Sequence, residues 1–154
     1  EERKGIIKHG SKMIQAVTNC TVPKITLRIG ASFGAGEYGM AGRSFDPRFL
    51  FSWPNNKLSV MGGEQAGKTM SQVAVESAKR RGEEPNMEMI KVIENKIIDT
   101  YAEEGEALFA TARLWDDGLI DPRDTRKILG ECLVIVCDSE KRELRPNTFG
   151  IGRM

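Results

Sequence analysis

Glycine is concentrated in one short segment of this chain, and that segment limits the folds the chain can adopt. Five of the 16 glycines lie between residues 30 and 42. They follow residues 24–29, where polar and apolar side chains alternate and β-branched residues occupy the apolar face, as in a β-strand. Glycine adopts positive φ and lets a second backbone or a ligand approach closely. We therefore predict a strand that runs into a tight turn, with the chemical centre of the molecule at that turn.

Much of the remaining chain is predicted to be helical. Apolar side chains recur every three or four residues in several segments, which indicates amphipathic helices. One of these helices has a typical start, with Asp121 as N-cap and Pro122 at the first helical position. The predicted helices cover residues 3–20, 66–81, 86–104 and 121–138, and the second and third are expected to form a protruding helical hairpin over residues 66–104.

Two further short strands are predicted ahead of that hairpin. Residues 48–53 are apolar and aromatic, and residues 58–61 form a second short apolar run. The sequence Pro54-Asn55-Asn56 between them is a turn signal. The chain therefore offers two or three convincing strands, and the residues from 141 onward are predicted to be extended.

The composition excludes several classes of function. The chain has 154 residues, with 23 Lys and Arg against 22 Asp and Glu, which gives a net charge of +1. Nucleic acids and acidic membranes select a clear basic excess, so neither is an expected partner. No apolar run approaches the roughly 18 residues that a membrane span needs. The three cysteines lack C-x-x-C spacing, which favours a reducing compartment and no zinc site.

One motif indicates a nucleotide-binding protein. Gly62–Thr69 fits the pattern G-x-x-x-x-G-K-[ST] between a predicted strand and a predicted helix, where a P-loop would bind phosphate. Residues 133–137 would lead to a magnesium-side carboxylate at Asp138 if they formed a strand. However, residues 121–138 are predicted to form one helix, which leaves no strand for Asp138 to end. The two or three predicted strands are also too few for a nucleotide-binding parallel sheet. A P-loop module that uses Gly62–Thr69 is therefore kept as the alternative function.

The glycine-rich turn itself has three interpretations. Gly34–Gly39 fits the dinucleotide pattern G-x-G-x-x-G, but the acidic residue expected about 20 positions later is missing. The glycines could simply permit close packing in a tight strand-to-helix turn. The third interpretation is an oxyanion hole, in which consecutive backbone N–H groups face a developing negative oxygen.

Few side chains in the sequence could act as catalysts. His9 is the only histidine, and there is no Cys–His couple or serine elbow, so a catalytic triad is not expected. Four carboxylates fall within nine residues and suggest a hard cation, but helix capping explains part of this cluster, so no metal site is predicted. These four residues are Asp116, Asp117, Asp121 and Asp124.

Several segments together resemble one family. They closely resemble the C-terminal half of the carboxyltransferase β subunits of acyl-CoA carboxylases, most of all the methylcrotonoyl-CoA and then the geranyl-CoA branch. The segments are IGASFGAG (29–36), YGM (38–40), DPRF (46–49), WPN (53–55), SVMGGEQA (59–66), RLWDDGLIDPRDTR (113–126) and FGIGRM (149–154).

The resemblance implies an α/β fold of the crotonase type, a superhelix of strand–strand–helix turns, here truncated. It implies transfer of CO₂ from carboxybiotin to an unsaturated, branched acyl-CoA, with biotin carried on another protein because no biotin attachment segment is present. By position, the backbone N–H groups of Ala35 and Gly36 would be catalytic. The expected biotin-binding residues are Phe33, Gly34, Ala35, Gly36 and Tyr38.

The resemblance also implies partners and a location. The partners are the biotin carboxylase and biotin carrier α subunit, acyl-CoA and further β subunits, and the location is a bacterial cytoplasm or a mitochondrial matrix. Two residues depart from the family, because Glu37 stands where Asn is common and Ala41 where Cys is common. At Gly67-Lys68-Thr69 the family usually has small apolar residues.

The first residue is Glu1, not Met, so we expect residues 1–154 to be a fragment that lacks the acyl-CoA-binding N-terminal domain. Such a fragment is expected to be inactive alone, or to be a purely structural piece that packs against partners. Apolar stripes near residues 6–17 and 90–97 are expected to make it self-associate.

Overall fold

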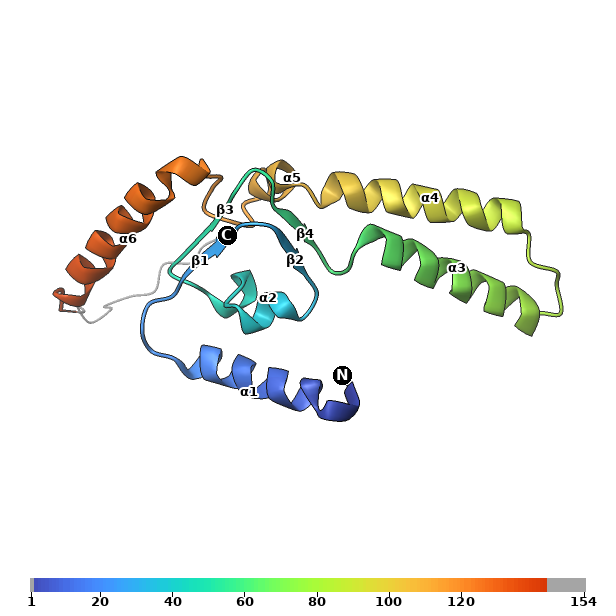
Figure 1. Cartoon of the computed structure of the whole chain (residues 1–154), viewed down its shortest axis with the longest axis horizontal. Helices are drawn as coiled ribbons and strands as arrows, with labels where there is room; N and C mark the ends of the chain where they lie inside the picture. The colour runs from blue at the N-terminus through green and yellow to red at the C-terminus, as the bar shows by residue number, and fades with distance from the viewer. Residues whose placement is uncertain (1, 144–154) are drawn as a thin grey trace, which may run out of the picture. The chain divides into compact units, whose positions relative to one another are not determined.

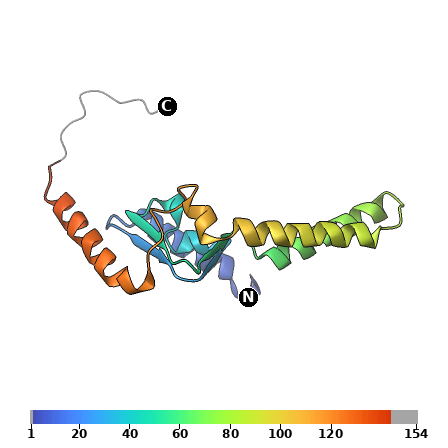
Figure 2. The ribbon, with the colours of Figure 1, turned by 90° about the horizontal axis from the view of Figure 1, so that it is seen from above.

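The computed structural model describes residues 2–143 (Figures 1 and 2). The chain divides after Pro122 into two compact units, which are described separately. The elements of the first unit are η1 (Glu2–Lys4), α1 (Ile6–Asn19), β1 (Ile25–Arg28), β2 (Ala31–Phe33), α2 (Gly36–Gly39), η2 (Arg43–Phe45), β3 (Phe49–Ser52), β4 (Lys57–Ser59), α3 (Gly63–Arg80), α4 (Met87–Glu104) and α5 (Ala107–Thr111).

The four short strands form two parallel pairs. β1 pairs with β3, with Ile25 opposite Phe49, and β2 pairs with β4, with Ala31 opposite Lys57. The Lys57 N–H donates to the Gly30 carbonyl at 2.8 Å, which links one ladder to the next. Each pair of consecutive strands is followed by a helix, α2 after β2 and α3 after β4, which gives the strand–strand–helix order that the resemblance implies.

The glycine-rich segment is more structured than the sequence suggested. It was predicted to be one tight turn, but it contains the strand β2 and the one-turn helix α2. The reason is topological, because parallel neighbours need a crossover of about a dozen residues or more. Residues 34–48 are the part of the crossover that both pairs share, from β1 to β3 and from β2 to β4, and α2 and η2 lie within it.

The buried apolar side chains of the first unit are mostly small, while many large ones are exposed. No residue of α1 is buried, and Ile6, Ile7 and Met13 are among its exposed apolar residues. Helix α1 packs on α2, where Met13 Sδ lies 3.5 Å from the position that a Cβ on Gly39 would take. The core consists of Ala41, Leu50, Ala66, Ala78, Ala107, Ala110 and Ile120.

Helices α3 and α4 lie side by side in both views, and the loop 81–86 reverses the chain between them (Figures 1 and 2). The Asn86 side chain caps α4 by accepting a hydrogen bond from the Met89 N–H at 3.1 Å. The Ser71 hydroxyl donates to Glu94 at 2.6 Å and connects the two helices. Both helices were predicted from their periodicity, and α3 begins three residues earlier than expected.

The P-loop alternative is not supported by this geometry. Helix α3 begins at Gly63, so nearly all of Gly62–Thr69 is helical and no loop remains to surround a phosphate. The Thr69 hydroxyl donates to the Gln65 carbonyl at 2.8 Å within the same helix. Gly67 instead faces α4, where an added Cβ would lie 3.0 Å from Ile98 Cγ1.

A segment after α5 extends the sheet beside β3. The Asp117 N–H donates to the Leu50 carbonyl at 2.7 Å, and the Leu50 N–H donates to the Asp117 carboxylate at 2.7 Å. Asp116 accepts a hydrogen bond from the hydroxyl of Ser52, a fully buried residue, at 2.8 Å. Both carboxylates therefore hold the segment after α5 against strand β3.

Within residues 2–143, no three His, Cys, Asp or Glu side chains gather in a way that could hold a metal ion.

The second unit contains helix α6 (Thr125–Glu140), which the 3₁₀ turn η3 (Pro122–Asp124) precedes. The prediction that Asp121 caps this helix was wrong, because the chain enters through the 3₁₀ turn and Asp124 occupies the cap position without a side-chain cap bond. Asp138 lies within the helix, so it does not end a strand. The predicted extended tail lies mostly outside the described residues, and so does the motif at 149–154.

None of the helices within residues 2–143 is both long and apolar enough to cross a lipid bilayer.

Candidate active site

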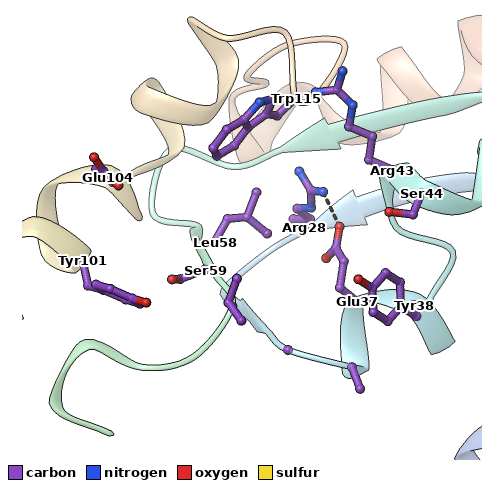
Figure 3. Close-up of a pocket in the computed structure, with 13 residues that line it drawn as sticks. Arg28, Glu37, Tyr38, Arg43, Ser44, Leu58, Ser59, Tyr101, Glu104 and Trp115 are labelled. Atoms are coloured by element: carbon purple, nitrogen blue, oxygen red, sulfur yellow. Dashed lines mark hydrogen bonds and ion pairs between the residues drawn. The ribbon is translucent and has the colours of Figure 1, made fainter. Parts of the chain in front are cut away.

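A pocket of about 700 Å³ lies beside the glycine-rich segment (Figure 3). One side is formed by the crossover that begins at Gly34, and another by strand β4 and the residues that follow it. The end of α4 and Trp115 complete the wall. The lining residues are Arg28, Gly34, Ala35, Glu37, Tyr38, Arg43, Ser44, Leu58, Ser59, Val60, Tyr101, Glu104 and Trp115.

The pocket brings together three of the five residues that the sequence predicted. Gly34, Ala35 and Tyr38 line it. Phe33 lines a different pocket, which is formed with the first turns of α3, because consecutive strand residues point to opposite faces. Gly36 adjoins Ala35 at the start of α2 and does not line the pocket.

The backbone at the start of the crossover is fixed by hydrogen bonds on both sides. Gly34 has φ 64°, and its N–H donates to the Ser59 carbonyl at 3.2 Å. An added Cβ on Gly34 would lie 3.1 Å from the Val60 carbonyl oxygen, so both conformation and space favour glycine here. The Gly34 carbonyl accepts from the Glu37 N–H at 3.2 Å.

Two backbone donors in this turn are not used by the protein. The N–H groups of Ala35 and Gly36 have no hydrogen-bond acceptor among residues 2–143, and both residues are exposed. An unpaired N–H group at the edge of a pocket is available to an oxygen of a bound ligand. These are the two donors that the resemblance assigned to catalysis.

Behind the turn lies an ion pair that the sequence did not predict. The Arg28 guanidinium donates to the Glu37 carboxylate, and the two side chains point toward each other in Figure 3. The Arg28 side chain is 4% exposed and that of Glu37 is 18% exposed. The Ser32 hydroxyl also donates to Glu37, and the backbone N–H of Arg43 does so as well.

These contacts determine the charge of Glu37. Burial raises the pKa of its carboxyl group, but the hydrogen bonds from Arg28 and Ser32, the positive charge of Arg28 and the Arg43 N–H outweigh that effect. The pKa of Glu37 therefore lies below that of an ordinary glutamate. Glu37 is ionised at neutral pH, and its lone pairs are largely occupied, which makes it a poor general acid or base.

A prediction on pH follows for Glu37→Gln. A carboxyl whose pKa is lower in the folded state stabilises the fold above its unfolded pKa, and this contribution is lost as the pH falls through the folded pKa. We expect the free energy of unfolding to fall less steeply in the variant than in the wild type between about pH 6 and pH 3. Urea titrations over this range measure the slope. Glu76→Gln, at an exposed ion pair on α3, is the control and should retain the wild-type slope.

The wall formed by β4, the end of α4 and Trp115 has both aromatic and aliphatic side chains. Trp115 is 37% exposed and meets the ring of Phe109 edge to face at a centroid distance of 5.9 Å. The Arg113 guanidinium lies over the ring of Phe109, with its Cζ 3.2 Å from the ring centroid. Leu58 and Val60 add aliphatic surface, and Ser59 and Glu104 add polar groups to the same side of the pocket (Figure 3).

Comparison with known proteins identifies the family. The family model described as "Carboxyl transferase domain" matches residues 1–149. A probable mitochondrial methylcrotonoyl-CoA carboxylase β chain of Drosophila melanogaster is 46% identical over 99% of this chain, and the match covers 26% of that protein. The chain thus spans about a quarter of the length of the relatives that it matches.

Solved structures agree with the sequence match. The β subunit of geranyl-CoA carboxylase from P. aeruginosa superimposes with a TM-score of 0.86 and 50% identity, over 99% of this chain and 28% of that one. A transcarboxylase 12S structure, described as a hexamer assembly, superimposes with a TM-score of 0.70 and 29% identity, over 97% of this chain and 27% of that one. This chain therefore belongs to the carboxyl transferase domain family and has its crotonase-like fold.

Proposed function

We propose that this chain is the biotin-side part of a carboxyltransferase β subunit, which moves a carboxyl group from biotin on a partner protein to an acyl-CoA. The single observation that carries the proposal is the pair of unused N–H groups of two exposed residues, Ala35, which lines the pocket, and its neighbour Gly36. Membership of the carboxyl transferase family supports the same reaction class.

The residues at this edge fit biotin. Its cyclic urea presents a carbonyl oxygen, an acceptor that matches two adjacent N–H donors. The pocket volume of about 700 Å³ lies within the range of small-molecule sites. Gly34, Ala35, Gly36 and Tyr38 would hold the group, with Phe33 on the neighbouring face. When bound, biotin supplies the carboxyl group that is transferred.

The contribution of this chain would be electrostatic. The N–H groups of Ala35 and Gly36 would stabilise negative charge on an acceptor oxygen at the pocket edge, and they are held in position before the ligand arrives. Glu37 would not exchange protons, because its carboxylate already accepts three hydrogen bonds. Catalysis in this half of the site would thus depend on the backbone and not on a side-chain acid or base.

The proposed substrate is an unsaturated, branched acyl-CoA, which the names of the methylcrotonoyl-CoA and geranyl-CoA carboxylase relatives support. The proposed partners are a biotin-carrying α subunit and further β subunits. The exposed apolar residues of α1 support association between β subunits.

We also propose that residues 1–154 belong to one carboxyltransferase domain with a helical hairpin over 66–104. The enzyme is proposed to work in a bacterial cytoplasm or a mitochondrial matrix.

The test uses the full-length β subunit that contains these residues, assembled with its biotin-carrying partner. Carboxylation is measured on a panel of acyl-CoA thioesters, with straight saturated chains and branched α,β-unsaturated chains of equal length. We expect transfer, with preference for the branched unsaturated members. No transfer to any member would overturn the proposed reaction, and preference for straight saturated chains would overturn the proposed substrate alone.

A further inference from the structure

The Glu37 network links both ends of the crossover turn. This network consists of Glu37 and its three hydrogen-bond donors, Arg28 on β1, Ser32 on β2 and the N–H of Arg43 in η2. Through these donors, a single carboxylate connects two strands with the segment that follows α2. The turn that contains Ala35 and Gly36 lies between these attachment points.

The backbone of Glu37 tightens the same turn. Its N–H donates to the Gly34 carbonyl at 3.2 Å, and its carbonyl accepts from the Gly42 N–H at 2.8 Å. A Cβ on Gly42 would overlap Glu37 Cγ and Oε1, so the side chain lies directly against that glycine. Position 42 therefore needs glycine because the Glu37 side chain occupies the space beside it.

Stability alone does not account for this ion pair. Two of the Arg28 guanidinium nitrogens, Nε and Nη1, are buried without a hydrogen-bond partner among residues 2–143. Removing charges from water is costly, and a buried ion pair is often no more stabilising than apolar side chains of the same size. The contribution specific to this pair is geometric, because it fixes the position of the Glu37 carboxylate.

We propose that Glu37 and Arg28 are positioning residues, which hold the N–H groups of Ala35 and Gly36 in the direction that a ligand oxygen requires. This inference rests on the proposed function. The two N–H groups lie between Gly34 and Glu37. Gly34 is held by backbone hydrogen bonds with Glu37 and Ser59, and Glu37 is held by its carboxylate, so loss of the carboxylate would release the C-terminal end of the turn. Misplacement of a reacting group by about 1 Å costs on the order of 100-fold in rate, so a loosened turn would slow transfer without a change in the ligand contacts.

The first arm of the test measures turnover in the full-length enzyme. Glu37→Gln is expected to lower kcat for carboxyl transfer by about 10- to 100-fold, with KM for acyl-CoA within about twofold of wild type. Glu37→Gln alone leaves the buried charge of Arg28 unpaired, whereas the double variant Arg28→Met/Glu37→Gln removes both charges of the pair. The melting temperature of the double variant is therefore expected to return toward that of wild type while kcat stays low, which a purely structural role would not produce.

The second arm does not depend on activity. Hydrogen exchange of the same subunit, followed by mass spectrometry, is expected to be on the order of tenfold faster in peptides from residues 31–43 of Glu37→Gln, with no change in residues 63–104. Glu76→Gln should leave both regions and kcat unchanged.

The outcomes separate this inference from the proposed function. Unchanged exchange in residues 31–43 would overturn the role of the Glu37 network even if the enzyme transfers carboxyl groups normally. Faster exchange with wild-type kcat would show that the network holds the turn but that transfer does not need it, which also overturns the inference. A wild-type enzyme without transfer activity would instead remove the proposed function.

Discussion

Gly36→Pro is expected to lower the rate of carboxyl transfer in the full-length enzyme by about 10²–10³-fold, because removal of one oxyanion donor costs about 3–4 kcal/mol in comparable sites. Proline lacks the backbone N–H that Gly36 offers at the edge of the pocket. Gly36 is the first residue of α2, a position that tolerates proline, but Ala35 has φ −66° and ψ −16°, a conformation that a following proline disfavours, so this variant also shifts the backbone at Ala35. Single-turnover measurements with the loaded biotin carrier report the chemical step directly.

Gly36→Ala is the matched control for this variant. A Cβ on Gly36 would meet no atom within 4 Å, and φ at this position is not in the left-handed region, so alanine fits and keeps the N–H. We expect Gly36→Ala to lose far less activity than Gly36→Pro. Equal losses in both variants would mean that crowding and not the N–H group matters, and an unchanged rate in Gly36→Pro would remove Gly36 from the catalytic donors.

The long helices could be predicted because their signal is local. Helices α1, α3 and α4 each span at least 14 residues with apolar side chains at helical spacing, and their ends lie within a few residues of the predicted ones. The strand β1 was also predicted, because alternation over six residues is a local pattern as well. Propensity and periodicity act within one segment, so the sequence of that segment is sufficient.

The short strand β2 was missed because it depends on a partner elsewhere in the chain, whereas β3 and β4 were predicted from their apolar runs. β2 has three residues, and its ladder partner β4 lies 26 positions away, with Ala31 opposite Lys57. Three residues carry no periodicity, and the glycines on both sides of β2 indicate a turn. The pairing that makes this segment a strand is non-local, and a single sequence contains no direct sign of it.

The candidate site was also predicted only in part, because some of its contacts are local in sequence and others are not. The glycine pattern located the turn, and the resemblance assigned the donors to Ala35 and Gly36, but Arg28 was overlooked. The alternation in β1 placed Arg28 on the polar face, where a charged side chain is expected to meet water. The structure buries Arg28 against Glu37, nine positions later. The available signal was a strand arginine followed by an unusual acidic residue in the glycine segment.

Gly67→Leu is expected to lower the free energy of unfolding by about 2–3 kcal/mol, although glycine is a poor helix former and its replacement in a helix normally stabilises. The reason is contact with α4, because a Cβ on Gly67 would lie 3.0 Å from Ile98 Cγ1, 3.1 Å from Glu94 Cγ and 3.2 Å from the Glu94 carbonyl oxygen. A backbone oxygen on the facing helix cannot move aside as a side-chain end can. The larger leucine must push the two helices apart. Urea unfolding of the wild type and the variant measures the difference.

Gly10→Ala separates helix propensity from packing in this experiment. Gly10 lies within α1, and a Cβ there would meet no atom within 4 Å, so this substitution should stabilise the chain by up to about 1 kcal/mol. Opposite signs for the two variants would show that close approach of α3 and α4 requires glycine at position 67. The P-loop interpretation makes a different prediction, because there Gly67 serves phosphate binding and faces no helix. A stability of Gly67→Leu equal to or above that of wild type would therefore contradict the helix contact described here.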